Sequence, residues 1–239
     1  MEKLNTENNN PSILFLHGYN QNAHIFNTRL KNIQKNLNKK FNNKLNYIFV
    51  DAPFELKEQS IENEIQRGWM FFDKLDNFYE LNSIKYKGLE ESIDFIFKQG
   101  DLNKNIQCIF SFSQGSVLLI FIIILSLYKE NKYDIKKHFP NLKCLVIVSG
   151  FYRPIPENEE FKEILEIFNK NEEIKKIDIP IMNVFGKNDQ FVDNNKSKEI
   201  SKFFEIFEEF NHDGKHYVPS SKKDIIKFEN FLEKYLKFN

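Results

Sequence analysis

A serine at a strand-to-helix turn near the middle of the chain is the feature that most constrains the fold. Residues 105–110 have the pattern of a short β-strand, and residues 117–127 are apolar enough for a buried helix. Between them, Ser111-Phe112-Ser113-Gln114-Gly115 is a variant of the G-x-S-x-G nucleophile elbow, with serine in place of the first glycine. The pattern predicts that Ser113 stands exposed at the carboxyl end of a strand. A serine-rich turn without chemistry is the alternative.

Length and charge narrow the classes of function. A chain of 239 residues without a Pro-, Gly- or Ser-rich linker fits one large α/β domain over residues 11–239. The polar residues 1–10 are expected to be a disordered tail. The 34 basic and 34 acidic residues balance, so no net field attracts nucleic acid or an anionic membrane. We therefore expect no nucleic-acid partner.

The N-terminal tail, the most apolar segment and the two cysteines together predict a cytoplasmic protein. The N-terminal tail lacks the apolar core of a signal peptide. Residues 117–125 form the most apolar segment, about half of the ~20 residues that a membrane span needs, so we expect no stable membrane insertion. Cys108 and Cys144 each lie in an apolar, strand-like run, which predicts reduced, buried thiols rather than metal ligands. Their sulfurs would lie close together if the two strands are neighbours in a parallel sheet.

Strand and helix patterns alternate along the chain. Strands are predicted at residues 13–16, 47–50, 105–110, 144–148, 179–186 and 205–211, and helices at residues 24–37, 88–99, 117–127, 156–176, 195–204 and 221–236. This alternation predicts an α/β fold, a mostly parallel sheet of about six strands with helices on both faces. Residues 55–86 show only weak periodicity.

Three aspartates compete for the role of the acid that orients a catalytic histidine. Asp189 lies just past the end of strand 179–186, where such an acid is expected. Asp193 lies farther along and suits the N-cap of the next helix. Asp51 precedes Ser113, whereas the order after a nucleophile elbow is serine, acid, histidine, so a capping or loop role is expected for it.

Two histidines compete for the base. His216 lies in a loop before the last helix, where Gly214 gives the backbone freedom to bring the imidazole over the sheet, and it is favoured. His212 lies at a strand end and is expected to close the turn. The side chain of His17 is expected to hydrogen-bond its own loop.

The backbone beside His17 has another predicted role. A strand that ends in His-Gly is where one backbone N–H of an oxyanion hole is supplied, while the residue after the nucleophile supplies the other. The predicted donors are the N–H groups of Tyr19 and Gln114.

Taken together, these motifs resemble the FSH-domain serine hydrolases, a branch of the α/β-hydrolases. The match covers nearly the whole chain and rests on Leu16-His17-Gly18-Tyr19, Val50-Asp51-Ala52-Pro53, Gly68-Trp69, Gly88-Leu89, Phe112-Ser113-Gln114-Gly115, Val148-Ser149-Gly150-Phe151, Val184-Phe185-Gly186 with Asp189, and Gly214-Lys215-His216 with Pro219. The resemblance implies an α/β-hydrolase fold that lacks the two leading strands of larger relatives. It implies Ser113 as nucleophile, Asp189 as acid and His216 as base.

The resemblance also implies the reaction, which is hydrolysis of a small carboxylic ester or acyl thioester without a metal or cofactor. Trp69 and Phe151, near predicted strand ends, are candidates for lining an apolar acyl pocket, and a core position is the alternative for both. A silent hydrolase fold that binds a partner, or an acyltransferase with the same triad, stays open as a function. Neither acyl chain length nor oligomeric state follows from the sequence.

Overall fold

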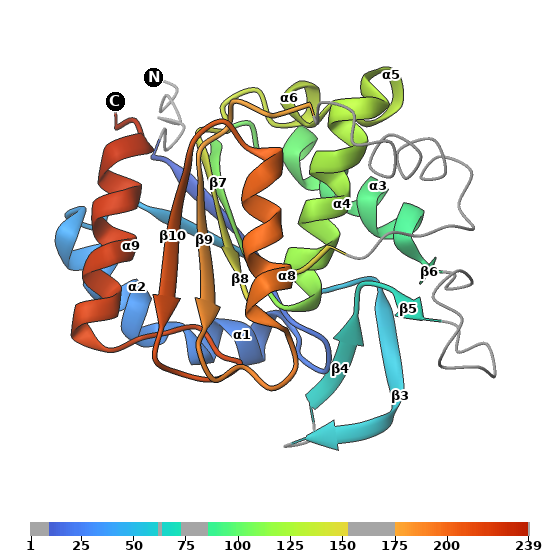
Figure 1. The fold of residues 1–239 in the computed structure, drawn as a ribbon, viewed down its shortest axis with the longest axis horizontal. Helices are drawn as coiled ribbons and strands as arrows, with labels where there is room; N and C mark the ends of the chain where they lie inside the picture. Colours follow the sequence, from blue (N-terminus) through green and yellow to red (C-terminus); the bar gives the residue numbers. More distant parts are fainter. Residues whose placement is uncertain (1–9, 62–63, 73–85, 153–174, 239) are drawn as a thin grey trace, which may run out of the picture.

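A six-stranded parallel sheet forms the centre of the protein (Figure 1). The computed structural model describes residues 10–238 except 62–63, 73–85 and 153–174, so residues 1–9 of the expected tail and nearly all of the predicted helix 156–176 lie outside the described residues. The sheet order is β10-β9-β8-β7-β1-β2, and each neighbouring pair is parallel. Its strands are β1 (Ser12–Leu16), β2 (Asn46–Val50), β7 (Ile106–Phe112), β8 (Cys144–Val148), β9 (Ile181–Gly186) and β10 (Phe207–His212). The predicted α/β class is confirmed.

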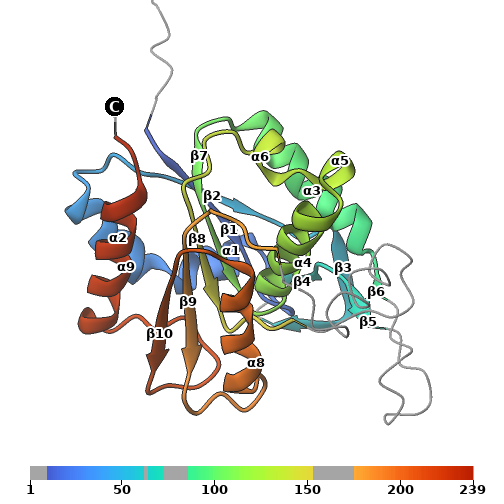
Figure 2. The same ribbon diagram turned by 45° about the horizontal axis from the view of Figure 1, so that its top comes forward.

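Helices cover both faces of this sheet (Figures 1 and 2). One face packs against α1 (Ala23–Arg29), α2 (Lys31–Lys40) and α9 (Lys222–Tyr235). The other packs against α3 (Leu89–Leu102), α4 (Gln114–Tyr128) and the 3₁₀ helix η1 (Glu199–Phe203), which continues α8 (Asn194–Lys198). The short helices α5 (Glu130–Tyr133) and α6 (Ile135–His138) follow α4.

The helices on both faces explain why the strands are apolar at successive positions. In β1, Ile13 and Phe15 pack on the α1-α2-α9 side, while Leu14 and Leu16 pack on the α4 side. Successive side chains of a strand point to opposite faces, so a sheet covered twice needs apolar residues at every position. Helix α4 is buried all round from its first residue to Leu127, as a core helix requires. No helix among the described residues is long and apolar enough to cross a bilayer.

The two cysteines lie side by side in the sheet. Cys108 of β7 is the register partner of Cys144 in β8, both side chains are fully buried, and both thiols are free. Burial, together with the neighbouring Cys144 thiol, holds the pKa of Cys108 well above its usual value. The two strands are neighbours in the parallel sheet, which is the condition stated for the sulfurs to lie close together, and the Cys108 thiol stays protonated at neutral pH.

The structure departs from the predicted elements in three places. The predicted helix 195–204 is α-helical only to Lys198 and continues as the 3₁₀ helix η1. The predicted helix 24–37 is divided into α1 and α2 at Leu30, whose N–H is shared between the carbonyls of Phe26 and Asn27. Residues 55–86, which carried little pattern, contain an antiparallel hairpin that projects from the body of the protein (Figure 1), formed by β3 (Phe54–Ile61) and β4 (Glu64–Gly68). A second short pair, β5 (Phe71–Phe72) and β6 (Tyr86–Lys87), follows it. Glu55 and Arg67 are partners across the hairpin and form a 2.8 Å ion pair.

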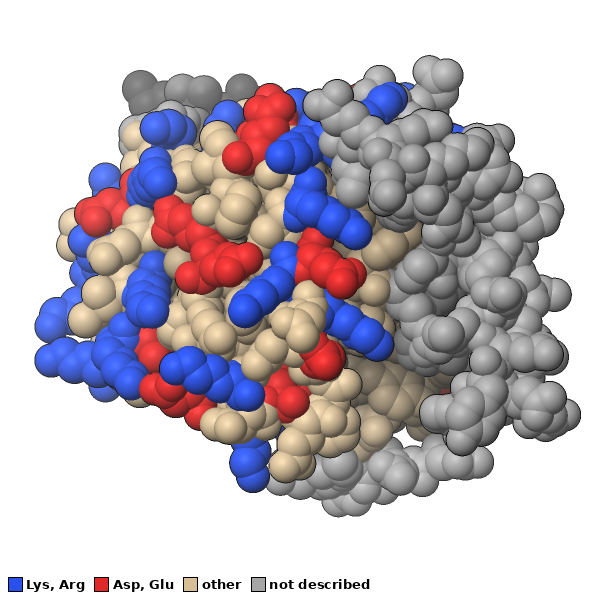
Figure 3. All heavy atoms as spheres, viewed as in Figure 1, with Lys and Arg blue, Asp and Glu red and all other residues tan. Residues whose placement is uncertain are grey.

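Positive and negative side chains are intermixed on the surface. Figure 3 shows lysine and arginine beside aspartate and glutamate over the described part of the viewed face. Ion pairs such as Lys234 Nζ to Glu208 Oε1, at 3.0 Å, join residues far apart in sequence. This arrangement agrees with the even count of charges in the sequence.

Candidate active site

Ser113 lies at a sharp turn between β7 and α4. Its backbone has φ 51° and ψ −116°, a conformation that is strained for a residue with a side chain. The Ser113 N–H donates to the Val148 carbonyl at 2.9 Å, which ties the turn to β8. A Cβ atom at Gly115 would lie 2.6 Å from the Leu16 carbonyl oxygen. The turn therefore requires glycine at that position, because α4 begins against the end of β1.

Ser111, which replaces the first glycine of the elbow pattern, has a structural explanation. Its side chain is fully buried and its hydroxyl donates to the Val146 carbonyl at 3.2 Å. Ser116 Oγ lies 3.0 Å from Ser111 Oγ and 3.0 Å from the Val148 carbonyl. Two hydroxyl groups thus fill the space behind the turn with their hydrogen bonds satisfied.

The structure brings Ser113, His216 and Asp189 together at the carboxyl edge of the sheet. Asp189 follows β9, and His216 follows the neighbouring strand β10. His216 Nε2 lies 2.9 Å from Ser113 Oγ, and His216 Nδ1 lies 2.8 Å from Asp189 Oδ2. An ionised carboxylate only accepts hydrogen bonds, so Nδ1 carries the proton and Nε2 is free to accept from the serine hydroxyl.

The surroundings of Asp189 keep its carboxylate ionised. The side chain is only 1% exposed, and this burial raises its pKa. Hydrogen bonds from His216 and from the N–H groups of Val192, at 3.0 Å, and Phe191, at 2.9 Å, outweigh burial and hold the pKa below its ordinary value. Asp189 therefore carries a fixed negative charge beside the imidazole.

Aromatic rings flank the imidazole of His216. The Phe112 ring centre lies 5.1 Å away, and that of Phe191 lies 5.3 Å away. Phe191 is 84% exposed, so it covers His216 from the solvent side.

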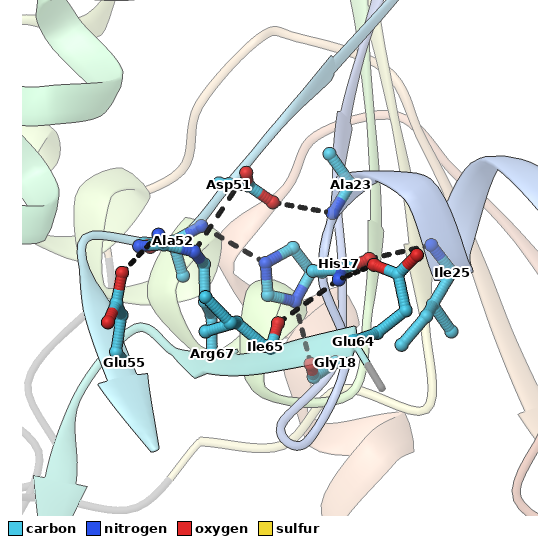
Figure 4. Close-up of polar contacts among 11 residues, drawn as sticks. His17, Gly18, Ala23, Ile25, Asp51, Ala52, Glu55, Glu64, Ile65 and Arg67 are labelled. Atoms are coloured by element: carbon cyan, nitrogen blue, oxygen red, sulfur yellow. Dashed lines mark hydrogen bonds and ion pairs between the residues drawn. The ribbon is translucent and has the colours of Figure 1, made fainter. Parts of the chain in front are cut away.

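The competing residues have structural roles. Asp193 accepts from the Asn195 N–H at 2.7 Å and caps α8. Asp51 accepts from the Ala23 N–H at 2.7 Å, at the first residue of α1 (Figure 4). His212 is buried, and its Nδ1 accepts from the N–H of Gly214 at 3.1 Å.

His17 holds the loop that follows β1. Its Nε2 accepts from the Ala52 N–H at 3.0 Å, so Nδ1 carries the proton and donates to the Gly18 carbonyl at 2.8 Å (Figure 4). The ring is fully buried, and burial lowers the pKa of His17 to about 4. The neutral imidazole thus fixes the backbone that leads into Tyr19.

Trp69 joins this loop to the serine turn. Its indole N–H donates to the His17 carbonyl at 2.8 Å, and its backbone N–H donates to Gln114 Oε1 at 2.7 Å. Gln114 Nε2 donates in turn to the Met70 carbonyl at 2.8 Å. Sequence reasoning offered Trp69 for the acyl pocket, but the side chain is fully buried beneath the loop and lines neither cavity described below.

The two predicted oxyanion donors are free to bind a ligand. The N–H groups of their neighbours are occupied, since Ser113 donates to Val148 and Gly18 donates to Gln21 Oε1 at 3.3 Å. Within the described part of the chain, the N–H groups of Tyr19 and Gln114 have no acceptor. Gln114 is the first residue of α4, where N–H groups lack an acceptor within the helix.

Two cavities meet at Ser113. The smaller, about 350 Å³, is lined by Tyr19, Met70, Phe71, Ser113, Gln114, Val117 and Phe151. The larger, about 530 Å³, is lined by Tyr19, Gln21, Phe26, Arg29, Leu30, Phe112, Ser113, His216, Tyr217, Val218 and Ser220. Of the two aromatic candidates from the sequence, Phe151 lies at the site. Among the described residues, no group of three or more His, Cys, Asp or Glu side chains could hold a metal ion.

The parallel sheet, the strained serine turn and the residues that meet at its carboxyl edge define the protein as an α/β-hydrolase. The model of the serine hydrolase (FSH1) family matches residues 6–228, and the chain belongs to this family. The resemblance seen in the sequence is thereby confirmed.

Curated relatives and solved structures agree with this assignment. The chain is 26% identical over 239 residues to Esterase OVCA2 of Danio rerio, covering 93% of this chain and 96% of the relative. It is 26% identical over 225 residues to Esterase CG5412 of Drosophila melanogaster, covering 92% of this chain and 73% of the relative. The crystal structure of SOBER1 from Arabidopsis thaliana matches with a TM-score of 0.61 at 18% identity, over 94% of this chain and 98% of that chain. Zea mays acyl-protein thioesterase 2 matches with a TM-score of 0.57 at 15% identity, over 94% and 93%.

Proposed function

We propose that this serine hydrolase cleaves carboxylic esters or acyl thioesters through a Ser113–His216–Asp189 triad and an acyl-enzyme intermediate. The observation that carries the proposal is the unbroken hydrogen-bond chain, 2.9 Å from Ser113 to His216 and 2.8 Å from His216 to Asp189. The names of the curated relatives, which are esterases, support the ester class.

The geometry supports a two-step mechanism. Ser113 Oγ attacks the carbonyl carbon while His216 Nε2 takes the hydroxyl proton, and the ionised Asp189 stabilises the imidazolium that forms. His216 then donates this proton to the departing alcohol or thiol, leaving the acyl group on Ser113. Water, deprotonated by the same imidazole, attacks the acyl-enzyme and releases the acid.

The negative oxygen of each tetrahedral intermediate would bind to the N–H groups of Tyr19 and Gln114. Each such donor is worth about 3 to 4 kcal/mol of transition-state stabilisation in enzymes of this kind. The bonds from His17 and Trp69 fix both donors before substrate arrives, so no reorganisation is needed during the reaction.

A fluorophosphonate probe, which modifies only activated serines, tests the proposal. Wild type should be labelled, Ser113→Ala should lose labelling completely, and His216→Ala should lose most of it. Ser149→Ala is a matched control, since Ser149 directly follows the adjacent strand β8 with a similar φ of 50° but has a fully buried side chain. Labelling should persist in this control.

Hydrolysis of p-nitrophenyl esters and acyl thioesters is measured in parallel, with circular dichroism to verify folding. If folded wild type is neither labelled nor active on any of these substrates, the proposed triad is wrong and a binding function is indicated. If an added alcohol or amine captures most of the acyl group in place of water, the protein is an acyltransferase.

A further inference from the structure

We infer that the natural substrate carries an anionic group, a carboxylate or a phosphate, on its leaving-group half, and that Arg29 binds this group in the larger cavity. The inference rests on the proposed hydrolysis at Ser113. It assigns a substrate class and a specificity-determining residue to the same site.

The path of the proton decides which cavity takes which half of the substrate. His216 must donate to the leaving oxygen or sulfur, so the leaving group lies on the side of the serine that His216 lines. His216 lines the larger cavity, together with Tyr217 and Val218. The acyl group then occupies the smaller cavity, where four apolar side chains are available, namely Met70, Phe71, Val117 and Phe151.

Arg29 gives the leaving-group side a permanent positive charge. It is the last residue of α1 and lines the larger cavity, whose lining contains no aspartate or glutamate. A guanidinium is charged at every physiological pH and presents its N–H groups in a fork that matches a carboxylate or phosphate. A neutral leaving group would give the Arg29 guanidinium no opposite charge in the cavity.

The Arg29 guanidinium takes part in no structural ion pair or hydrogen bond among the described residues. Within the described residues, no hydrogen-bond acceptor or carboxylate pairs with it. Arg67 shows the contrast, since it binds Glu55 at 2.8 Å, lies 3.9 Å from Asp51 and has a side chain that is only 21% exposed (Figure 4).

The site predicts a moderate rather than an absolute preference for an anion. Tyr19 and Tyr217, which line the larger cavity, are 47% and 49% exposed, so water reaches the bound group. Solvent screening reduces the strength of an exposed ion pair, and we therefore expect a preference of about tenfold.

Matched pairs of hexanoyl thioesters test the inference. One member of each pair has 3-mercaptopropionate or 6-mercaptohexanoate as the leaving thiol, and the other has the corresponding neutral amide. Released thiol is measured with Ellman's reagent. Wild type should prefer the carboxylate by about tenfold in kcat/KM, mainly through KM, and added salt should lower this ratio.

Substitutions at Arg29 separate its role from that of the rest of the cavity. In Arg29→Gln the ratio of carboxylate to amide should fall close to one, and Arg29→Lys should give an intermediate ratio. Lys31→Gln is the control, because Lys31 lies two positions along the chain and lines a different hollow. Its ratio should equal that of wild type. A thioester of 2-mercaptoethyl phosphate, compared in the same variants, shows whether phosphate or carboxylate is the better ligand.

The outcomes distinguish the inference from the proposed function. If the amide thioesters are hydrolysed but wild type and Arg29→Gln show the same ratio, the inference is wrong while the hydrolase function stands. If no ester or thioester is hydrolysed and Ser113 is not labelled, the proposed function fails and the inference falls with it.

Discussion

Lowering the pH from 7.5 to 5 should destabilise the protein through His17. In the folded state this ring is fully buried and uses its unprotonated Nε2 to accept from Ala52, and burial holds its pKa at about 4. In the unfolded chain the same histidine titrates near its usual pKa of about 6.5.

The sign and size of the effect follow from these two values. Between about pH 6.5 and pH 4 the unfolded chain binds a proton at His17 that the folded protein does not, so the stability falls as the pH falls through this window. Integration from pH 7.5 to pH 5 gives a loss of about 2 kcal/mol from His17 alone.

Urea denaturation of wild type and His17→Gln at both pH values measures this contribution. Glutamine cannot titrate, so the difference in unfolding free energy between wild type and His17→Gln should shrink by about 2 kcal/mol at pH 5. Other titrating groups, including His212, whose pKa burial also lowers, are present in both proteins and cancel.

A matched control removes a buried side chain that does not titrate. The Ser149 side chain is fully buried, and Ser149→Ala should keep a constant difference from wild type because a serine hydroxyl neither gains nor loses a proton in this pH range. If the His17→Gln difference is the same at both pH values, burial does not keep His17 neutral, and the account of the oxyanion loop is wrong.

Two further predictions concern the site. Asp189→Asn should lower kcat on p-nitrophenyl esters on the order of 10³- to 10⁴-fold, because the amide no longer favours the required tautomer of His216, and a loss below tenfold would refute the assigned role. Ser111→Gly restores the usual elbow glycine but removes a hydroxyl that lies 3.0 Å from Ser116 Oγ, so urea denaturation should show a loss of about 1 kcal/mol while fluorophosphonate labelling persists. Lost labelling at unchanged stability would contradict this prediction.

Much of the fold could be predicted because the four central strands of the sheet, β1, β7, β8 and β9, are buried at every position. Continuous apolar runs such as 144–148 match the observed strand Cys144–Val148 at both ends. The hairpin of β3 and β4 was not predicted because it lies outside the main sheet and its residues show no clear alternation of apolar and polar side chains. Its pairing includes contacts between the two strands, such as Glu55 with Arg67, that no local periodicity reveals.

The candidate triad could be predicted for a different reason. Residues that follow parallel strands meet at one edge of the sheet, so chain order alone brought Ser113, Asp189 and His216 to the same place. The support around them was not predictable, because Trp69 and Gln114 act through bonds to backbone atoms distant in sequence. The place of Trp69 near a predicted strand end suggested a pocket residue, whereas its side chain is fully buried and its indole N–H donates to the His17 carbonyl.

In the proposed mechanism, the order of the elements along the chain also determines when Ser113 can become reactive during synthesis. Ser113, its strand and both proposed oxyanion donors leave the ribosome first, and His216 follows 103 residues after the serine. Helix α9, which comes later still, closes the sheet behind the nucleophile, with the Phe228 ring 5.5 Å from that of Phe110 in β7. Under the proposed triad, a nascent chain therefore holds Ser113 without its base, and we expect reactivity to begin only when the C-terminal elements have docked.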